Sequence, residues 1–255
     1  LLSGEACGVE FSVTDGIAMG MGLAADSDQR LQAAVTFELS HNENNGHVFL
    51  PRNKLISATT QLLDSGAELV EQALDSLIER GAVDQEQVAN VEACYLRRLW
   101  EAECSACIRL AGLLAADTDC SAQAGRAVDE LEAQQGITYA PLQRQAVELA
   151  ARTGVLVLTG GPGTGKTTTV RGIVALFRRM GLEIVLAAPT GRAAKRMSEL
   201  TGMEAQTVHR MLGMSWNDVT HQVTFQKTEK EPLEADAVIV DEMSMVVLAL
   251  FSALL

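Results

Sequence analysis

The stretch that decides the fold is Val155-Leu-Val-Leu-Thr-Gly-Gly-Pro-Gly-Thr-Gly-Lys-Thr-Thr-Thr169. A short apolar run leads into Gly160-x-x-x-x-Gly165-Lys166-Thr167, and a segment compatible with a helix follows. Glycines let successive backbone N–H groups point at a phosphate chain, and the start of the helix adds the positive end of its dipole. A glycine-rich turn that matches by chance is disfavoured, because the pattern predicts a strand before it and a helix after it. The stretch therefore predicts a phosphate-binding loop for a nucleoside triphosphate.

Two motifs supply the predicted chemistry. We expect Lys166 to reach the β- and γ-phosphates of the nucleotide, and Thr167 to offer its hydroxyl to Mg²⁺. A second apolar strand, Val238-Ile-Val240, ends in the carboxylates Asp241 and Glu242. Asp241 is expected to hold Mg²⁺ opposite Thr167, and Glu242 to polarise the attacking water. Lys166 and Glu242 are thus the predicted catalytic residues. The predicted nucleotide contacts of the loop are Gly161, Pro162, Gly163, Thr164, Gly165, Lys166, Thr167 and Thr168.

A third group of motifs places hydroxyls beside basic residues where helices are expected to start. Pro189-Thr190-Gly191-Arg192 follows an apolar strand, and Thr207-Val-His209-Arg210 precedes another helix. Hydroxyls and N–H groups at a helix start suit a nucleic-acid phosphate. A purely structural role for His209 remains an equal alternative.

The net charge of −13 is distributed unevenly over the 255 residues. Residues 1–136 carry 8 basic and 22 acidic side chains, a balance of −14, whereas residues 137–255 carry 12 and 11, a balance of +1. Local charge governs contact with a phosphate backbone, so the second half remains compatible with a nucleic-acid partner. No apolar run is long enough for a membrane span and no signal-peptide pattern is found at the start of the sequence, which predicts a cytoplasmic protein without a membrane partner.

The five cysteines, an odd number, indicate reduced thiols. Cys104-x-x-Cys107 falls in a segment expected to be helical, where we expect small, core-facing side chains. A metal site formed by Cys94, Cys104, Cys107 and Cys120 is the less favoured alternative.

The pattern of apolar residues predicts a mainly helical first half and an alternating α/β second half with a parallel sheet. In the first half a capping box at Ser65 and Glu68 is expected to begin a helix whose apolar stripe is Leu69, Ala73, Leu74, Leu77 and Ile78. Two short helices and an extended piece in this region resemble a winged-helix unit; its acidic second helix favours packing over DNA binding. The first-half expectations are helices at 14–21, 27–39, 51–63, 67–80, 91–116 and 121–135, strands at 47–50 and from Val83, and a loop at 41–46. The second-half expectations are helices at 141–152, 167–180 and 191–200, strands at 155–159, 183–187 and 238–240, and a hairpin strand at 219–226.

Taken together, the motifs at 160–167, 188–194, 207–210 and 238–244 resemble superfamily 1 DNA helicases, and in detail the RecD family. That family comprises the α subunit of exodeoxyribonuclease V and its stand-alone relatives. Leu142-Gln143-Arg-Gln-Ala-Val147 is similar to the adenine-recognition segment of the family, which would place Gln143 on the base. Asn45-Gly-His-Val-Phe-Leu-Pro51 resembles the front module of the stand-alone, long-form members.

The resemblance implies an α/β fold: a P-loop NTPase (RecA-like) parallel-sheet domain after a mainly helical module with helix-hairpin-helix and winged-helix-like parts. The implied boundaries are 1–40 for the end of the helix-hairpin-helix module, 41–120 for the winged-helix-like module, 121–136 for a connecting helix, and 137–255 for the first motor domain with a β insertion at about 213–234.

The implied function is an ATP-dependent 5′–3′ DNA helicase of recombination and repair, with single-stranded DNA contacted by Thr190, Gly191, Arg192, Thr207 and His209. A P-loop switch without translocation, and a docking role beside RecB- and RecC-like subunits, are the alternatives.

Two departures from the family pattern matter. Glu10 stands in Gly8-Val-Glu10-Phe11, where the family hairpin has a second glycine, and would oppose a DNA phosphate. The second motor domain, which supplies arginines to the ATP site, is not in this sequence. We therefore expect the chain to bind ATP and Mg²⁺ weakly, with little ATPase and no unwinding.

Overall fold

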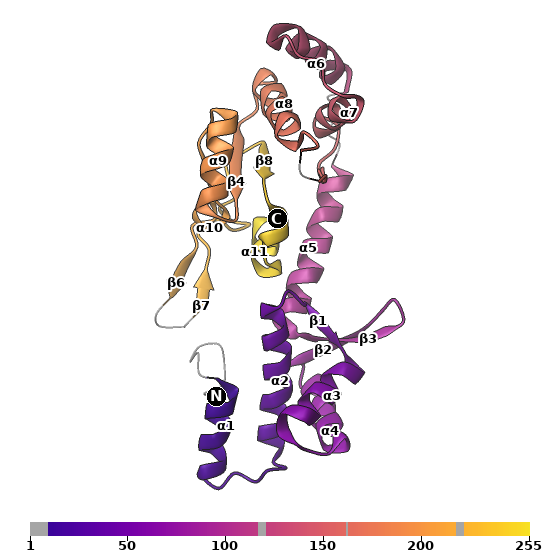
Figure 1. Ribbon diagram of the computed structural model, residues 1–255, viewed down its shortest axis with the longest axis vertical. Helices are drawn as coiled ribbons and strands as arrows, with labels where there is room; N and C mark the ends of the chain where they lie inside the picture. The colour runs from indigo at the N-terminus through magenta and orange to yellow at the C-terminus, as the bar shows by residue number, and fades with distance from the viewer. Residues whose placement is uncertain (1–9, 117–120, 162, 218–221) are drawn as a thin grey trace. The chain divides into compact units, whose positions relative to one another are not determined.

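The computed structural model describes residues 10–116, 121–161, 163–217 and 222–255 (Figure 1). The chain forms two compact units, one built chiefly from Leu1–Cys104 and the other from Ser105–Asn217 and Val223–Leu255. Each unit has a sheet and a core of its own, and they are described separately.

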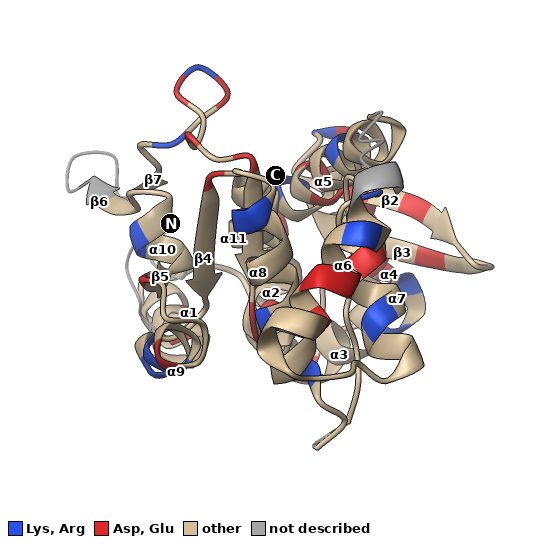
Figure 2. Cartoon of the chain, turned by 90° about the horizontal axis from the view of Figure 1, so that it is seen from above, with Lys and Arg blue, Asp and Glu red and all other residues tan. Residues whose placement is uncertain are grey.

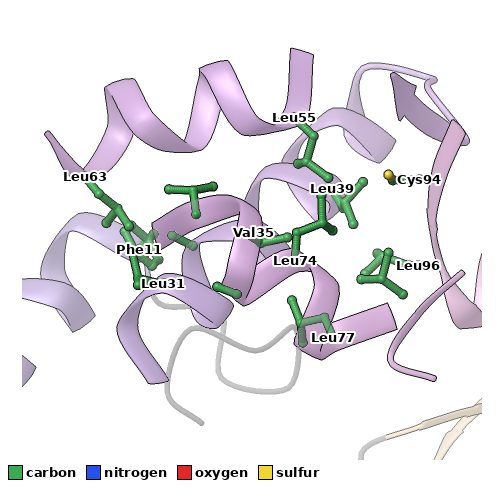
Figure 3. Packing of buried hydrophobic residues seen from close by; sticks show 14 of the residues in the cluster. Phe11, Leu31, Val35, Leu39, Leu55, Leu63, Leu74, Leu77, Cys94 and Leu96 are labelled. Atoms are coloured by element: carbon green, nitrogen blue, oxygen red, sulfur yellow. The ribbon is translucent and has the colours of Figure 1, made fainter. Parts of the chain in front are cut away.

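The first unit packs helices on a small antiparallel sheet. Its helices are α1 (Phe11–Gly20), α2 (Asp28–Asn44), α3 (Arg52–Leu63) and α4 (Ala67–Glu79). Its strands are β1 (Phe49–Pro51), β2 (Val83–Val88) and β3 (Val91–Leu96), in the order β1-β3-β2. The core joins α2, α3 and α4 through residues such as Val35, Leu55 and Leu74, all fully buried (Figure 3).

The apolar stripe of α4 differs by one position from the prediction. Ala73, Leu74 and Leu77 are buried, but Leu69 is 38% exposed and Val70 is buried in its place. The predicted capping box is wrong as well: α4 begins at Ala67, as predicted, but its N-cap is Gly66 rather than Ser65, and no side chain caps it.

The helix expected over 91–116 is wrong in its first six residues. Residues 91–96 form β3, which pairs with β1 on one side and β2 on the other. The preceding turn has Ala89 and Asn90 at φ +46° and +67°, the backbone of a two-residue hairpin turn. Only then does α5 (Arg97–Ala115) begin. The run was misread because Ala93–Leu96 are all buried, so strand alternation is missing from the sequence.

The loop predicted at His41–Gly46 is also wrong, because α2 continues to Asn44. The ring of His41 stacks on Phe37 with centroids 5.7 Å apart, and the Asn42 side chain donates to the Glu38 carbonyl at 2.8 Å. These local contacts extend the helix until Gly46, which has φ +85°, ends it.

The second unit is α/β, as predicted. Its helices are α6 (Ser121–Gln135), α7 (Pro141–Ala150), α8 (Lys166–Arg179), α9 (Gly191–Thr201), α10 (Val208–Met211) and α11 (Leu248–Leu254), with a 3₁₀ turn at Met243–Met245. The strands β4 (Ile184–Ala188), β5 (Ala205–Thr207) and β8 (Ala237–Val240) form a parallel sheet in the order β5-β4-β8. A separate two-stranded sheet pairs β6 (Ser215–Asn217) with β7 (Gln222–Thr224), within the region predicted as a β insertion. Of the hairpin strand predicted at 219–226, residues 222–224 form β7 and residues 219–221 lie outside the described residues.

The strand predicted at Val155–Thr159 does not form. This segment has no strand pairing, and Val157 is 78% exposed. Leu156 nevertheless packs against the same core cluster as Ala237 and Ile239 of β8. A strand needs a hydrogen-bonded partner, and among the described residues β8 pairs only with β4.

The cysteines do not behave as a group. Cys94 is buried, but it lies in strand β3 and not in a helix. On α5, Cys104 is half-buried and Cys107 is exposed. The expectation of core-facing cysteines on a helix is therefore wrong for Cys94 and for Cys107. Cys120 lies outside the described residues. Within the described ranges no three His, Cys, Asp or Glu side chains are grouped closely enough to hold a metal ion. No described helix has the length and apolar character that a membrane crossing requires.

Candidate nucleotide and phosphate site

The glycine-rich loop has the backbone that its sequence predicts. Gly163 and Gly165 have φ of +76° and +84°, a region that L-residues rarely adopt. Gly165 is the N-cap of α8, which starts at Lys166. A Cβ on Gly160 would lie 2.6 Å from the Thr164 hydroxyl, so the loop closes tightly on itself there. Pro162 lies outside the described residues.

Polar contacts fold the loop around its own lysine. The Lys166 ammonium donates to the carbonyl of Gly160 and, at 3.1 Å, to that of Gly161. The Thr164 hydroxyl also donates to the Gly161 carbonyl, at 2.9 Å. The ammonium therefore sits in the concave side of the loop with no carboxylate partner among the described residues, free to exchange carbonyl oxygens for phosphate oxygens.

Gln143 of α7 reaches this loop. Its side-chain nitrogen lies 2.1 Å from where a Cβ on Gly165 would be, and its side-chain oxygen accepts the Ala140 N–H at 3.1 Å. Only glycine at 165 leaves room for this approach. The structure thus brings the predicted base-recognition residue and the predicted phosphate loop together.

An ion-pair cluster that sequence reasoning missed holds α7 in place. Arg144 bonds Asp129 and Glu132 of α6, at 2.6 and 2.9 Å, and Glu148 of its own helix at 2.9 Å. Acidic residues of α6 are red in Figure 2. The Arg144–Glu148 pair has the i, i+4 spacing that a sequence can indicate. The two contacts to α6 depend on tertiary structure.

Helix α7 also packs closely on α8, which carries the loop. A Cβ on Gly172 would lie 2.8 Å from the Tyr139 hydroxyl and 2.9 Å from the side chain of Val147. Glycine at this position therefore lets the two helices approach, and so positions Gln143 relative to Gly165.

The two carboxylates lie at the carboxyl end of β8. Val240 pairs with Ala187 of β4, and the Asp241 N–H donates to the Ala187 carbonyl at 3.0 Å. Asp241 accepts the backbone N–H of Glu242 at 2.9 Å, and Glu242 has φ +52°. Both carboxylates are exposed and form no ion pair within the described chain. They remain available to a cation or a water molecule.

The predicted phosphate-contacting threonines lie at the same edge of the sheet. The Thr190 hydroxyl accepts the Ala193 N–H and the Thr207 hydroxyl accepts the Arg210 N–H, each at 3.2 Å, so both cap helices. Thr190 follows β4 and Thr207 ends β5, and in the parallel sheet β4 lies between β5 and β8. Because parallel strands end at one edge, Thr190, Thr207 and Asp241 are brought to that edge. Gly191, Arg192 and His209 are exposed there.

The loop and the sheet edge belong to one packed body. The partly buried Ala237 and Ile239 of β8 pack against a buried cluster that includes Ile173 and Leu176 of α8. Thr167 is half-buried and Thr168 exposed at the start of α8. The helix that carries the phosphate loop is thereby anchored on the sheet that carries Asp241.

Comparisons with known proteins agree with this arrangement. Residues 143–255 match an AAA domain, and residues 1–49 match the HHH domain of ATP-dependent RecD2 DNA helicases. The ATP-dependent RecD2 DNA helicase of Deinococcus radiodurans is 33% identical over 98% of this chain and 35% of its own length. The RecBCD enzyme subunit RecD of Mycolicibacterium smegmatis is 36% identical over 63% of the chain and 31% of its own length. The ATP-dependent DNA helicase dda of Enterobacteria phage T4 is 41% identical over 39% of the chain and 23% of its own length.

The chain thus spans about a third of the first two relatives, which leaves their whole-protein activities outside what the match covers. The match to residues 1–49 supports the predicted helix-hairpin-helix part of the fold, and within that range the structure describes α1 and α2.

Proposed function

Because the chain belongs to the RecD family, we propose that it binds ATP and single-stranded DNA as part of an ATP-dependent 5′–3′ DNA helicase of recombination and repair. The observation that carries the proposal is the common edge at which β5, β4 and β8 deliver Thr207, Thr190 and Asp241. A nucleotide switch does not need phosphate-contacting elements beyond its own nucleotide site, whereas a DNA motor does.

The nucleotide is assigned to the loop and to Gln143. The N–H groups of Gly163–Thr168 and the Lys166 ammonium would hold the phosphates, and Gln143 would hold the base. Mg²⁺ fits the donor set, because the Thr167 hydroxyl and the Asp241 carboxylate are hard oxygen ligands. When bound it would neutralise charge on the phosphates.

Hydrolysis requires a carboxylate that accepts a proton from water or orients it. Glu242 is exposed and adjoins Asp241, and its backbone is held in the left-handed region. We assign it to water activation, with Lys166 stabilising charge on the phosphates as it develops.

Single-stranded DNA is assigned to the edge formed by Thr190, Gly191, Arg192, Thr207 and His209. Association with RecB- and RecC-like subunits is the alternative partner assignment, supported by the relatives named as RecBCD subunits.

The proposal is tested by nucleotide binding to the 255-residue chain. Lys166→Ala should weaken the binding of a fluorescent ATP analogue with Mg²⁺ at least tenfold, because a charge-assisted contact to phosphate contributes about 1.5–3 kcal/mol. Lys230→Ala removes the same charge from an exposed turn and should change affinity less than twofold. Equal affinity of wild type and Lys166→Ala would refute the assignment.

The metal assignment has its own test. Asp241→Asn should abolish the increase in ATP affinity that Mg²⁺ produces in wild type. Glu242→Gln should retain that increase but lose any ATPase activity that the chain has. Isothermal titration with and without Mg²⁺ separates the two roles, and an unchanged Mg²⁺ effect in Asp241→Asn would contradict the ligand assignment.

A further inference from the structure

A group of basic side chains on α8 and α9 has no acidic partners among the residues that the structure describes. The basic face consists of Arg171 and Arg178 on α8 and Arg192, Lys195 and Arg196 on α9, all exposed. Figure 2 shows basic residues (blue) on α9. Within the described chain none of the five forms an ion pair, and the one acidic side chain exposed on these two helices is Glu199.

The lack of partners is informative because acidic side chains are in excess, 33 to 20. Eight of the eleven other arginines in the described ranges are paired with carboxylates, and one of these, Arg179, lies on α8 itself beside Glu130. Unpaired guanidinium groups clustered in such a chain are typical of a surface that contacts an external anion.

The basic face borders a hollow of about 360 Å³, between α8, the end of α9 and Gln135 of α6. Arg171 and Arg178 line one wall, seven residues apart and therefore on one stripe of α8. Glu199 lines the other wall, beyond ion-pair distance of both arginines. Arg192 and Arg196 continue along the stripe of α9 that ends at Glu199.

We propose that the part of the basic face around the hollow, led by Arg171 and Arg178, binds the phosphate backbone of duplex DNA. This rests on the proposed function and adds a second DNA contact to it. Arg192, at the start of α9, belongs to the assigned single-strand edge, and Thr190 caps this N-terminal end, whereas the hollow lies at the C-terminal end of the helix. The 11 residues of α9 span about 16 Å along the helix axis, and this length separates the hollow from the single-strand edge.

Duplex rather than single-stranded DNA is favoured by the chemistry of the lining. Single strands are commonly held by stacking bases on aromatic rings, but none of the residues lining the hollow is aromatic. Arg171 and Arg178 lie about 10.5 Å apart along the helix axis, comparable with the roughly 12 Å width of the major groove. The two guanidinium groups can therefore reach phosphates on both strands.

The test is the salt dependence of duplex binding by the 255-residue chain. Each lost phosphate contact lowers the slope of log K against log salt concentration by about 0.9. Arg171→Ala/Arg178→Ala should therefore reduce the slope for a blunt 20-base-pair duplex by about 1.8, with roughly tenfold weaker binding at 50 mM salt. Arg171→Lys/Arg178→Lys keeps the charges and should keep the slope.

Lys54→Ala/Arg126→Ala is the matched control, since it removes two exposed basic side chains that have no ion pair in the described structure. Its slope should equal that of wild type. Glu199→Gln should strengthen duplex binding, because it removes the one negative charge beside the hollow. Duplex binding should thus weaken when positive charge is removed from the hollow and strengthen when negative charge is removed from it.

An unchanged slope in Arg171→Ala/Arg178→Ala, an equal loss in the control, or no duplex binding by wild type at 50 mM salt would overturn the proposal. Loss of inorganic pyrophosphate binding with an unchanged duplex slope would also overturn it, in favour of a free-phosphate site. ATP binding measured on the same variants should match wild type, and it reports on the proposed function independently.

Discussion

At the scale of single residues, Gly163 and Gly165 of the phosphate loop both have positive φ. Substituting each by alanine can therefore distinguish the effect of backbone strain from the effect of displacing a neighbouring side chain. A Cβ on Gly163 would have no atom within 4 Å, whereas one on Gly165 would displace Gln143. Both alanine variants should lose about 1–2 kcal/mol of stability from strain alone. Gly165→Ala should in addition weaken binding of the adenine nucleotide relative to a triphosphate without a base.

Parallel thermal unfolding and titrations with ATP and tripolyphosphate measure the two effects. If Gly163→Ala and Gly165→Ala lose the same preference for ATP over tripolyphosphate, the role assigned to Gln143 is wrong.

Thiol reactivity is a second property decided residue by residue. Burial raises the pKa of the Cys94 thiol to about 11, and Cys107 is exposed. Because the thiolate is the nucleophile, at pH 8 a variant with Cys94 as its one cysteine should react with a maleimide far more slowly than one with Cys107. Denaturant should abolish the difference. Equal rates in the folded state would show that β3 is not buried as described.

At the scale of the element, α4 tests how much of a helix its neighbours determine. Leu74→Ala removes a fully buried side chain and should lower the free energy of unfolding of the first unit by about 2–5 kcal/mol. Leu69→Ala removes the same atoms from a position that is 38% exposed and should cost less than about 1 kcal/mol. Urea unfolding of both variants measures the two losses of free energy. Equal losses would show that Leu69 contributes to the core as much as Leu74 does, as the sequence pattern predicts.

The misassigned elements have a common cause. Helix periodicity and apolar runs are local signals, whereas the pairing of a strand depends on residues far away in the chain. Val91–Leu96 is a strand because β1 and β2 flank it, and Val155–Thr159 is not one because no partner binds it. The helices α6 and α8, whose signals are local, matched their predicted ranges within a residue.

At the scale of the whole molecule, the division into two units has a thermodynamic consequence. A ligand stabilises only the structure that binds it, by about 2.7 kcal/mol at a concentration of 100 Kd. ATP with Mg²⁺ should therefore raise the unfolding temperature of the second unit and leave that of the first unchanged. Calorimetry with Leu74→Ala marks the transition of the first unit, since that variant should lower it alone. A nucleotide shift in that transition would contradict the assignment.

The local composition of the chain determined its chemistry. The glycines, lysine and threonines of 160–168 predict a phosphate loop because close backbone approach needs glycine, and Asp241 and Glu242 are expected at a strand end because an apolar run precedes them. Hydroxyls at 190 and 207 likewise predict helix caps, and both helices are capped this way.

Tertiary structure alone decided which of these groups meet. The approach of Gln143 to Gly165, the ion pairs between Arg144 and α6, and the common edge shared by Thr190, Thr207 and Asp241 join segments that are far apart in the chain. It also left Arg171 and Arg178 of α8, and Arg192 and Arg196 of α9, without a carboxylate partner among the described residues, although the composition offers carboxylates in excess. Pairing depends on distance in space, and a sequence records only the order in which the groups occur.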